Sequence, residues 1–501
     1  MNNEAQNKMK EFKEYINKIE YLNSAASLLY WDMSVNMPKK GVEYRGKVLG
    51  HLTAEIYKLE TSDTMKEYLE YFSKINDLDK VHKSMIKSLK KNYELSKKIP
   101  EEKFKEYTIL ITQAEAAWED AYAKSDFSLF QPYLEKIVTF NKEFIEYWGY
   151  KGNKYNTLLD KFEEGITVDK LDNIFSELRE ALVKLLDKIK NSNVKIDENI
   201  FKNNFPKEKQ EKLSKIILEK MGYDFESGRL DESIHPFTIG FNRKDVRITT
   251  NYCDKDLRPA LFSSIHEGGH AIYDQDISEE LYGTGLGDGA SMGVHESQSR
   301  FYENILGRSK EFWTYFYTEV KKIFQEFKDV SLEEFYRGMN VVKPSLIRVD
   351  ADELTYSLHV IIRYEIEKAL INGDIEVENL PEVWNAKYKE YLGIEPSNDK
   401  EGVLQDNHWA GGMIGYFPSY ALGNIYGAQF FNKMKQDIPD VFKKIEKGNF
   451  EVIHEWLREN IHKYGAIYTP SELIKKVTGE ELTAKYFIEY LNNKYSKIYN
   501  L

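Results

Sequence analysis

Apolar residues recur every three or four positions along most of the chain, which is the spacing of amphipathic helices. The segment 206–222, PKEKQEKLSKIILEKMG, is the clearest case. Its apolar stripe consists of Leu213, Ile216, Ile217 and Met221. Pro206 suits the first helical position, and Gly222 suits a left-handed cap at the other end. Residues 1–200 follow the same pattern with few Pro or Gly breaks, so we expect long packed helices there.

One segment has the pattern of strands instead. Residues 235–252, HPFTIGFNRKDVRITTNY, are rich in Thr, Ile, Val and Phe, and the turn-prone residues 242–244 divide them. This composition predicts a small β-hairpin. The Asn- and Lys-rich stretch 190–204 is the best candidate for a boundary within the chain, with a surface loop as the alternative. The pattern thus predicts a mostly helical body with one small sheet.

A helical segment shortly after the predicted hairpin carries two histidines. In SSIHEGGHAIYD, residues 263–274, His266 and His270 are four positions apart, so they lie on one face of a helix and can bind one metal ion. Glu267 follows the first histidine. This is the H-E-x-x-H arrangement, in which the glutamate takes a proton from a water that zinc activates. The alternative is a pair of histidines that hydrogen-bond within a helical core.

A catalytic zinc site needs a third protein ligand and one open position. The segment 289–307, GASMGVHESQSRFYENILG, offers Glu296 and Glu303. They are seven residues apart and share nearly one face of a helix, so the spacing alone does not choose between them.

Two glycines lie between the histidines, although a glycine inside a helix costs about 0.5–1 kcal/mol relative to alanine. Gly268 and Gly269 either leave room for a substrate backbone beside the metal or allow a second helix to pack closely, and the sequence supports both explanations equally. The Gly-rich stretch 281–289, LYGTGLGDG, predicts a flexible rim to a cleft. It is not a dinucleotide-binding motif, because no strand precedes it and its spacing differs.

Composition narrows the class of protein. The 501 residues are 42% hydrophobic and 30% charged, which is typical of a globular protein with a sizeable core. The net charge is −12 and no dense run of Lys and Arg interrupts it, so a nucleic-acid partner is not expected. No run of 18 apolar residues is present, so no membrane span is expected. The single cysteine, Cys253, fits a reducing cytoplasm.

Six ordered segments resemble the thermostable carboxypeptidases of the carboxypeptidase Taq type, which are zinc-dependent H-E-x-x-H peptidases. The segments are HPF (235–237), DVRIT (245–249), HEGGH (266–270), HESQ (295–298), IRVDAD (347–352) and GVLQDNHW (402–409). Three further stretches, at 31–38, 126–138 and 415–431, extend the resemblance over nearly the whole chain. Six motifs in one order are far more specific than H-E-x-x-H alone.

This resemblance implies a fold and an activity. The expected fold is mostly α, similar to neurolysin and angiotensin-converting enzyme, with a deep groove and one small sheet next to the zinc helix. We expect one metallocarboxypeptidase domain, 1–501. In it an N-terminal helical subdomain, 1–200, forms part of the groove wall, and a catalytic subdomain, 201–501, holds the zinc.

The resemblance also implies a ligand set and a specificity. Glu296, the glutamate of HESQ, becomes the third ligand beside His266 and His270. The implied activity is the release of single C-terminal residues with broad specificity, poorly for proline, by a protein that is usually a homodimer. Zinc is the expected metal, and cobalt often supports activity in such enzymes.

Further residues are implied for the hydrolysis of a peptide bond. Glu267 is expected to act as general base and then to protonate the leaving amine. His408 and either Tyr420 or Tyr416 are candidate donors to the oxyanion, by resemblance to related helical metallopeptidases, and Tyr416 is also a candidate substrate contact. The alternative for either tyrosine is ordinary packing, since the chain has 35 tyrosines.

An exopeptidase must also recognise the free carboxylate of its substrate, and the planar fork of arginine pairs with both oxygens. Arg348 in IRVDAD is the first candidate and Arg247 in DVRIT the second. The alternative is that each arginine pairs with nearby acids to hold the fold. These acids are Asp245, Asp350 and Asp352. His235 and Asp274 are candidates for orienting the metal ligands.

Two other functions remain open from the sequence. An endo-acting oligopeptidase on the same fold would use the same metal chemistry and cut inside short peptides. A non-catalytic helical binding protein would keep zinc for structure only, in a closed site with four ligands. No fourth ligand is evident, and Cys253 lies outside the motifs. The family resemblance implies peptides with a free C-terminus as the partners.

Overall fold

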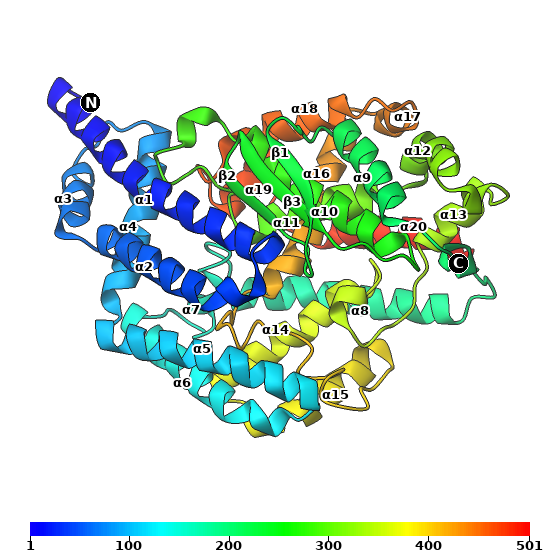
Figure 1. Ribbon diagram of the computed structural model, residues 1–501, viewed down its shortest axis with the longest axis horizontal. Coiled ribbons are helices and arrows are strands. Elements are labelled where there is room, and N and C mark those ends of the chain that lie inside the picture. Colours follow the sequence, from blue (N-terminus) through cyan, green and yellow to red (C-terminus); the bar gives the residue numbers. More distant parts are fainter.

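The computed structural model describes all residues, 1–501, and places most of them in helices around one small sheet (Figure 1). The helices before the sheet are α1 (Asn3–Val35), α2 (Val42–Glu60), α3 (Asp63–Phe72), α4 (Lys80–Lys98), α5 (Glu101–Lys124), α6 (Gln131–Trp148), α7 (Asn156–Leu159), α8 (Val168–Lys190) and α9 (Lys207–Met221). Those after it are α10 (Arg258–Asp276), α11 (Met292–Arg300), α12 (Lys310–Ile323), α13 (Leu332–Met339), α14 (Tyr356–Asn372), α15 (Leu380–Leu392), α16 (Pro418–Asp437), α17 (Val441–Glu446), α18 (Glu451–Asn460), α19 (Pro470–Thr478) and α20 (Lys485–Tyr499). The predicted fold class is confirmed. None of these helices has both the length and the apolar character needed to cross a membrane.

The sheet has three strands in the order β1-β3-β2. The strands are β1 (Gly228–Glu232), β2 (Thr238–Asn242) and β3 (Asp245–Thr250). β2 and β3 are antiparallel and form the predicted hairpin, whereas β1 pairs in parallel with β3 and is not predicted by the sequence pattern. The sequence of β1, GRLDE, contains a single large apolar residue, so it has no alternation to detect. β2 is left as an edge strand.

The segment 206–222 forms helix α9, which begins one residue later than the pattern predicts. Pro206 has φ −55° and ψ 139° and precedes the helix as its N-cap. Gly222 takes the predicted left-handed cap, with φ 110°. A side chain at Gly222 would be strained at this angle, which explains the glycine.

The Asn- and Lys-rich stretch 190–204 connects two parts of one continuous core. Phe201 and the neighbouring Phe205 are fully buried and pack against the ring of Phe327. Buried apolar residues from Met9 to Tyr499 belong to one cluster of 112 residues. The stretch 190–204 therefore does not separate two hydrophobic cores. The division into the subdomains 1–200 and 201–501 stays a prediction.

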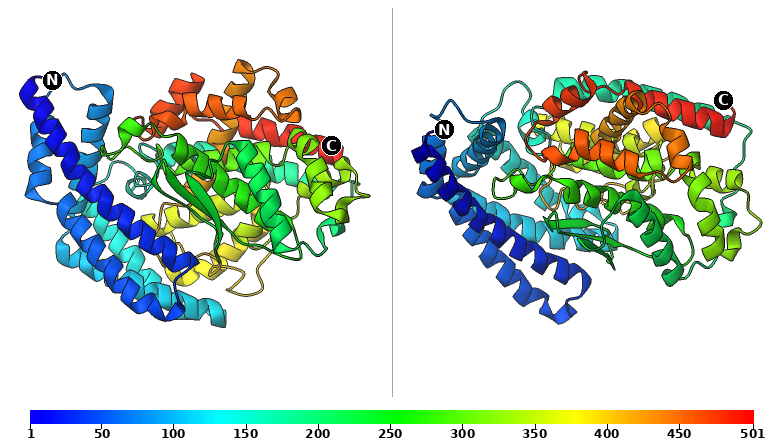
Figure 2. Two further views of the ribbon diagram at one scale, coloured as in Figure 1. Left: turned by 45° about the horizontal axis from the view of Figure 1, so that its top comes forward. Right: turned by 90° about the horizontal axis from the view of Figure 1, so that it is seen from above.

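Helices α1 and α2 lie side by side along one flank of the molecule, away from the C-terminal helices (Figure 2). α1 packs on the sheet through Trp31, whose ring lies 5.1 and 4.5 Å from the guanidinium carbons of Arg229 and Arg247. The carboxylate of Glu20 accepts two backbone N–H groups of the Gly-rich stretch 281–289, at 2.8 and 3.2 Å. These contacts tie α1 to the part of the chain that carries the H-E-x-x-H motif.

Candidate metal centre and active site

A groove with a volume of 1490 Å³ opens beside the edge strand β2. Residues of α1, β2, α10, α11 and the segment 341–352 line it. Helix α10 contributes one face, consisting of Arg258, Phe262, His266, His270 and Asp274. These residues are four apart, which is about 6 Å per step along a helix, so the two histidines lie in the middle of this face.

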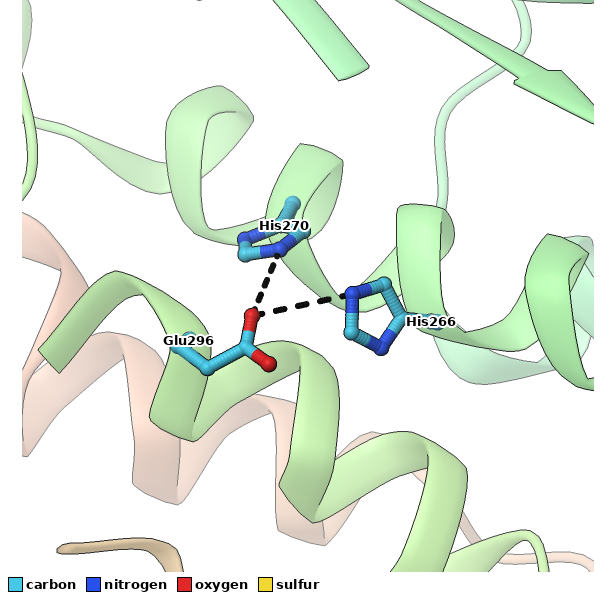
Figure 3. A group of neighbouring side chains, drawn as sticks. All are labelled: His266, His270 and Glu296. Atoms are coloured by element: carbon cyan, nitrogen blue, oxygen red, sulfur yellow. Dashed lines mark ion pairs between the residues drawn. The ribbon is translucent and has the colours of Figure 1, made fainter. Parts of the chain in front are cut away.

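His266, His270 and Glu296 converge on one point in the groove (Figure 3). Oε2 of Glu296 lies 3.6 Å from Nε2 of His266 and 3.3 Å from Nε2 of His270. The three donor atoms all lie within 4.8 Å of one another. Two imidazoles and one carboxylate form a donor set for a catalytic divalent metal, and such a set leaves one coordination position open. The residues present therefore fit a bound metal ion.

Glu303, the other glutamate that the sequence offers, lies behind His266 instead. Its Oε2 is 2.8 Å from Nδ1 of His266, the ring nitrogen that does not face Glu296. Arg300 donates from Nη1 to the same oxygen at 2.9 Å. Burial raises the pKa of Glu303, but Arg300 and His266 outweigh burial and bring this pKa to about 2. The ionised Glu303 therefore accepts the Nδ1 proton of His266, which leaves Nε2 free for a metal.

The carboxylate of Glu296 is held from several sides. Arg300, one turn later on α11, donates from Nε to Oε1 at 2.7 Å, and the Ser299 hydroxyl donates to Oε2 at 3.0 Å. Burial raises the pKa of Glu296, but Arg300 and the two histidines together bring it well below its ordinary value. Gly423 on α16 makes room for the side chain, because a Cβ there would lie 2.4 Å from Cγ of Glu296.

Gly268 and Gly269 face neighbouring helices. A Cβ at Gly268 would lie 2.3 Å from Cδ2 of Leu218 on α9, and a Cβ at Gly269 would lie 2.7 Å from Cα of Ser299 on α11. Close helix packing therefore accounts for both glycines. The explanation by space for a substrate is wrong, because neither position opens toward the groove.

Glu267 lines the groove next to the first histidine ligand. The residue is 7% exposed, and the hydroxyl of Thr238 on β2 donates to its Oε2 at 2.6 Å. A carboxylate fixed in this way can take a proton from a water in the groove. The edge strand thus orients the predicted general base.

Tyr416 and Tyr420 line the groove, and His408 contacts both rings from outside the lining. Nε2 of His408 is 3.0 Å from the Tyr420 hydroxyl, and the ring centres of the two tyrosines are 5.1 Å apart. Burial lowers the pKa of His408 to about 4, so this ring is neutral near pH 7. Burial raises the pKa of Tyr416 to about 12, so its hydroxyl stays a donor.

Arg348 also lines the groove, and its partner is Asp406. Nε and Nη2 of Arg348 donate to Oδ1 of Asp406 at 3.0 and 2.8 Å, and Nη1 donates to the Tyr356 hydroxyl at 3.0 Å. Arg363 pairs with the other oxygen of Asp406. A guanidinium has five N–H donors, so two on Arg348 have no protein partner. The alternative predicted for Arg348, a pairing with the neighbouring acids Asp350 and Asp352, is wrong, because its partner is Asp406.

Arg247 and His235 lie outside the groove lining. Arg247 pairs with both oxygens of Asp245, with its Nε and Nη2 each 2.8 Å from an oxygen, so the structure does not bring it to the groove. His235 is exposed. Asp274 does reach the surroundings of the metal centre, because its Oδ1 is 2.9 Å from Nε2 of His295.

Four residues that complete the site have no role in the sequence-based prediction. Arg300 follows Glu296 by four positions, and this spacing of opposite charges on a helix is a usable signal. His295 and Asp406 stand inside the quoted motifs HESQ and QDNHW without a role of their own. The contact of Thr238 depends on how β2 packs against α10, for which the local sequence carries no signal.

Fold and site together define a metal-dependent hydrolase of the H-E-x-x-H class, with its centre in a helical groove. The chain belongs to the carboxypeptidase Taq (M32) metallopeptidase family, which it matches over residues 11–495. It is therefore a metallocarboxypeptidase that uses a divalent metal and acts on peptides. The resemblance read from the sequence is confirmed, and family membership sets the non-catalytic alternative aside.

Individual relatives match over almost their whole length. Carboxypeptidase 1 of Bacillus subtilis is 51% identical over 494 residues, which cover 98% of this chain and 99% of that protein. Thermostable carboxypeptidase 1 of Thermus thermophilus is 39% identical, with 97% of this chain and 98% of that protein covered. The crystal structure of the M32 carboxypeptidase from Deinococcus radiodurans R1 has a TM-score of 0.97 at 35% identity, covering 99% of this chain and all of that one.

Proposed function

We propose that this metallocarboxypeptidase binds one zinc ion at His266, His270 and Glu296 and releases single residues from the C-terminus of peptides. The observation that carries the proposal is the convergence of the three donor atoms within 4.8 Å, beside Glu267. A set of two histidines and one glutamate suits zinc in catalytic sites. Cobalt accepts the same donors, so we expect it to substitute.

In this proposal several residues near the metal centre have separate tasks. A metal held by the three proposed ligands would supply Lewis-acid chemistry for the scissile carbonyl and for the attacking water. Glu267 takes the proton of that water and passes it to the leaving amine. The hydroxyls of Tyr420 and Tyr416 donate to the oxyanion that develops on the carbonyl, and His408 orients the Tyr420 hydroxyl through Nε2.

Arg348 receives the C-terminal carboxylate of the substrate. Its two unpaired N–H groups are available at the groove, while Asp406 and Tyr356 hold the rest of the guanidinium in place. Arg348 and Arg363 share the single carboxylate of Asp406, so the cluster keeps one net positive charge. A carboxylate of the substrate balances that charge in a largely buried place, which favours an exopeptidase.

Further parts of the proposal are supported by the family resemblance. They are broad specificity for the released residue, poor release of proline, a homodimer, and a cytoplasmic location. A C-terminal proline makes the scissile bond a tertiary amide without an N–H, which removes one donor from the substrate.

A time course on one unblocked decapeptide, followed by mass spectrometry, tests the proposed activity. We expect a ladder of products that shorten by one residue at a time from the C-terminus. Internal fragments at early times would favour the endo-acting oligopeptidase. The same decapeptide with an amidated C-terminus is the control, and equal cleavage of both peptides would overturn the role of a carboxylate site.

A further inference from the structure

His295 lies between a metal ligand and a carboxylate. Its Nδ1 is 2.5 Å from Nδ1 of His270, and its Nε2 is 2.9 Å from Oδ1 of Asp274. We propose that His270, His295 and Asp274 form a relay of hydrogen bonds. Through this relay the carboxylate of Asp274 polarises and orients the metal ligand His270. His295 and Asp274 are then positioning residues for the metal. This inference rests on the proposed function, in which His270 is a ligand.

The positions of the protons give the relay one direction. His270 faces Glu296 with Nε2, so this nitrogen needs a free lone pair, and the neutral ring carries its proton on Nδ1. That proton points at Nδ1 of His295, which must accept it. With Nδ1 as the acceptor, His295 has its own proton on Nε2, and Asp274 accepts it.

The other histidine ligand has a shorter version of the same arrangement. Nδ1 of His266 lies 2.8 Å from the carboxylate of Glu303, with nothing between them. Both histidine ligands are therefore linked to a carboxylate by hydrogen bonds. The link is direct for His266, whereas the imidazole of His295 lies in between for His270. Such partners fix the tautomer and the ring orientation of a ligand and make it more basic.

The packing around His295 keeps its ring in this orientation. The side chain is 16% exposed, and the ring centre of Tyr273 lies 5.1 Å away. Gly289 touches the ring edge, because a Cβ there would lie 2.7 Å from Cδ2 of His295. His295 also directly precedes Glu296 on α11, so a shift of the His295 backbone would also displace the ligand Glu296.

The same residues also resemble a second cation site, since donor atoms of Asp274, Asp288 and His295 lie within 4.8 Å of one another. A cation there would need the Nε2 lone pair of His295, which would place the ring proton on Nδ1. Two N–H groups would then face each other across the 2.5 Å gap to His270. The relay and a second cation exclude each other while both rings are neutral, so the number of bound metal ions distinguishes them.

Zinc binding to the full chain tests the relay, measured by competition with a chelator and by metal analysis. We expect His295→Phe, which cannot accept a hydrogen bond, and Asp274→Asn each to raise the Kd for zinc roughly 10- to 100-fold, as loss of such partners typically does. The double variant should bind no more weakly than His295→Phe, because Asp274 acts through His295. His295→Asn keeps one acceptor for His270 and should lose less than His295→Phe.

Asp288→Asn is the matched control, because it removes a neighbouring charge that is outside the relay. Its Kd should change less than that of Asp274→Asn, with one zinc per chain in every variant. Thermal unfolding of the metal-free proteins checks that each variant is folded. If His295→Phe is unstable, the nearly isosteric Asp274→Asn still tests the relay.

A Kd like that of the parent in Asp274→Asn and His295→Phe overturns the relay. Two zinc ions per chain, one of them lost in Asp288→Asn, also overturn it. His270→Ala separates the relay from the proposed function, because zinc retained by that variant would overturn the ligand set itself. Zinc lost in His270→Ala, together with parent-like binding in the relay variants, would overturn the relay alone.

Discussion

The hydroxyl of Thr238 donates a 2.6 Å hydrogen bond to Oε2 of Glu267, and so the edge strand β2 is joined to the predicted general base. The bond fixes one oxygen of a carboxylate that otherwise faces a groove. The small sheet therefore contributes to the proposed chemistry as well as to the packing of α10.

Thr238→Val should lower kcat by about tenfold or more and change KM little. A hydrogen bond to a charged group contributes about 1.5–3 kcal/mol, and here it acts on the base that moves a proton in the transition state. Thr238→Ser keeps the hydroxyl and is the control. Steady-state kinetics on one short peptide decide the matter, and a parent-like kcat in Thr238→Val would show that this bond is only structural.

Glu267→Gln should lower turnover by roughly 10²–10⁴-fold, the usual contribution of a general base. The amide is nearly isosteric, and Glu267 is outside the donor set, so metal content should stay near one ion per chain. Kinetics and metal analysis of the same preparation check both parts. Retained turnover removes Glu267 from the mechanism.

Arg348→Ala should raise KM for peptides with a free C-terminus, because the two available N–H groups are lost. A charged hydrogen bond of about 1.5–3 kcal/mol corresponds to about a tenfold rise or more. Arg247→Ala is the matched control, since Arg247 pairs with Asp245 outside the groove. An equal rise of KM in both variants would count against Arg348 as the carboxylate site.

Gly269→Ala should weaken metal binding and stability more than Gly268→Ala. A Cβ at Gly269 meets the backbone of Ser299 at 2.7 Å, so α11 and its ligand Glu296 must move, at a cost of about 1–3 kcal/mol. A Cβ at Gly268 meets the end of the Leu218 side chain, which can rotate away. Kd for zinc and thermal unfolding of the two variants test this order, and the reverse order would contradict it.

Asp276 should make stability depend on pH at the acidic end. It accepts hydrogen bonds from Nε2 of His454 and Nδ1 of His462, each at 2.8 Å. Burial raises its pKa, but the two histidines outweigh burial and bring the pKa from 3.8 to about 2. A carboxyl whose pKa is lowered by folding stabilises the folded chain above its unfolded pKa, and this contribution is lost as the pH falls toward the folded pKa.

The free energy of unfolding of the metal-free chain, from denaturant titrations, should therefore fall between about pH 4 and pH 2. Asp276→Asn should be less stable near neutral pH and should show a smaller fall in that window. If the slope of the variant matches that of the parent, Asp276 does not titrate in the way its contacts indicate.

Local sequence predicts much of this site because the two histidine ligands share a helical turn. His266 and His270 need only a regular helix to face one point. The third ligand needs more, since Glu296 and Glu303 fit one helix face equally well. In the structure a π-helical turn begins at Phe301, directly after Arg300, and Glu303 is directed to Nδ1 of His266. A change of helix type of this kind has no clear sequence pattern.

Contacts between distant parts of the chain explain the remaining differences. Arg348 pairs with Asp406, which lies 58 positions away, rather than with the acids beside it. Closing a longer loop adds little entropy cost, so proximity in sequence is a weak guide to the partner of a buried charge. The parallel pairing of β1 with β3 likewise depends on tertiary structure, because the five residues of β1 do not alternate.

Glu296 rests against Gly423 on α16, a helix that is synthesised well after α10 and α11. While the chain is still on the ribosome, both histidines and the glutamate emerge before the helix against which the glutamate packs. We therefore expect the nascent site to reach its final geometry only after α16 has been synthesised. A chain that ends before Pro418 keeps all three proposed ligands but should bind zinc more weakly than the full chain.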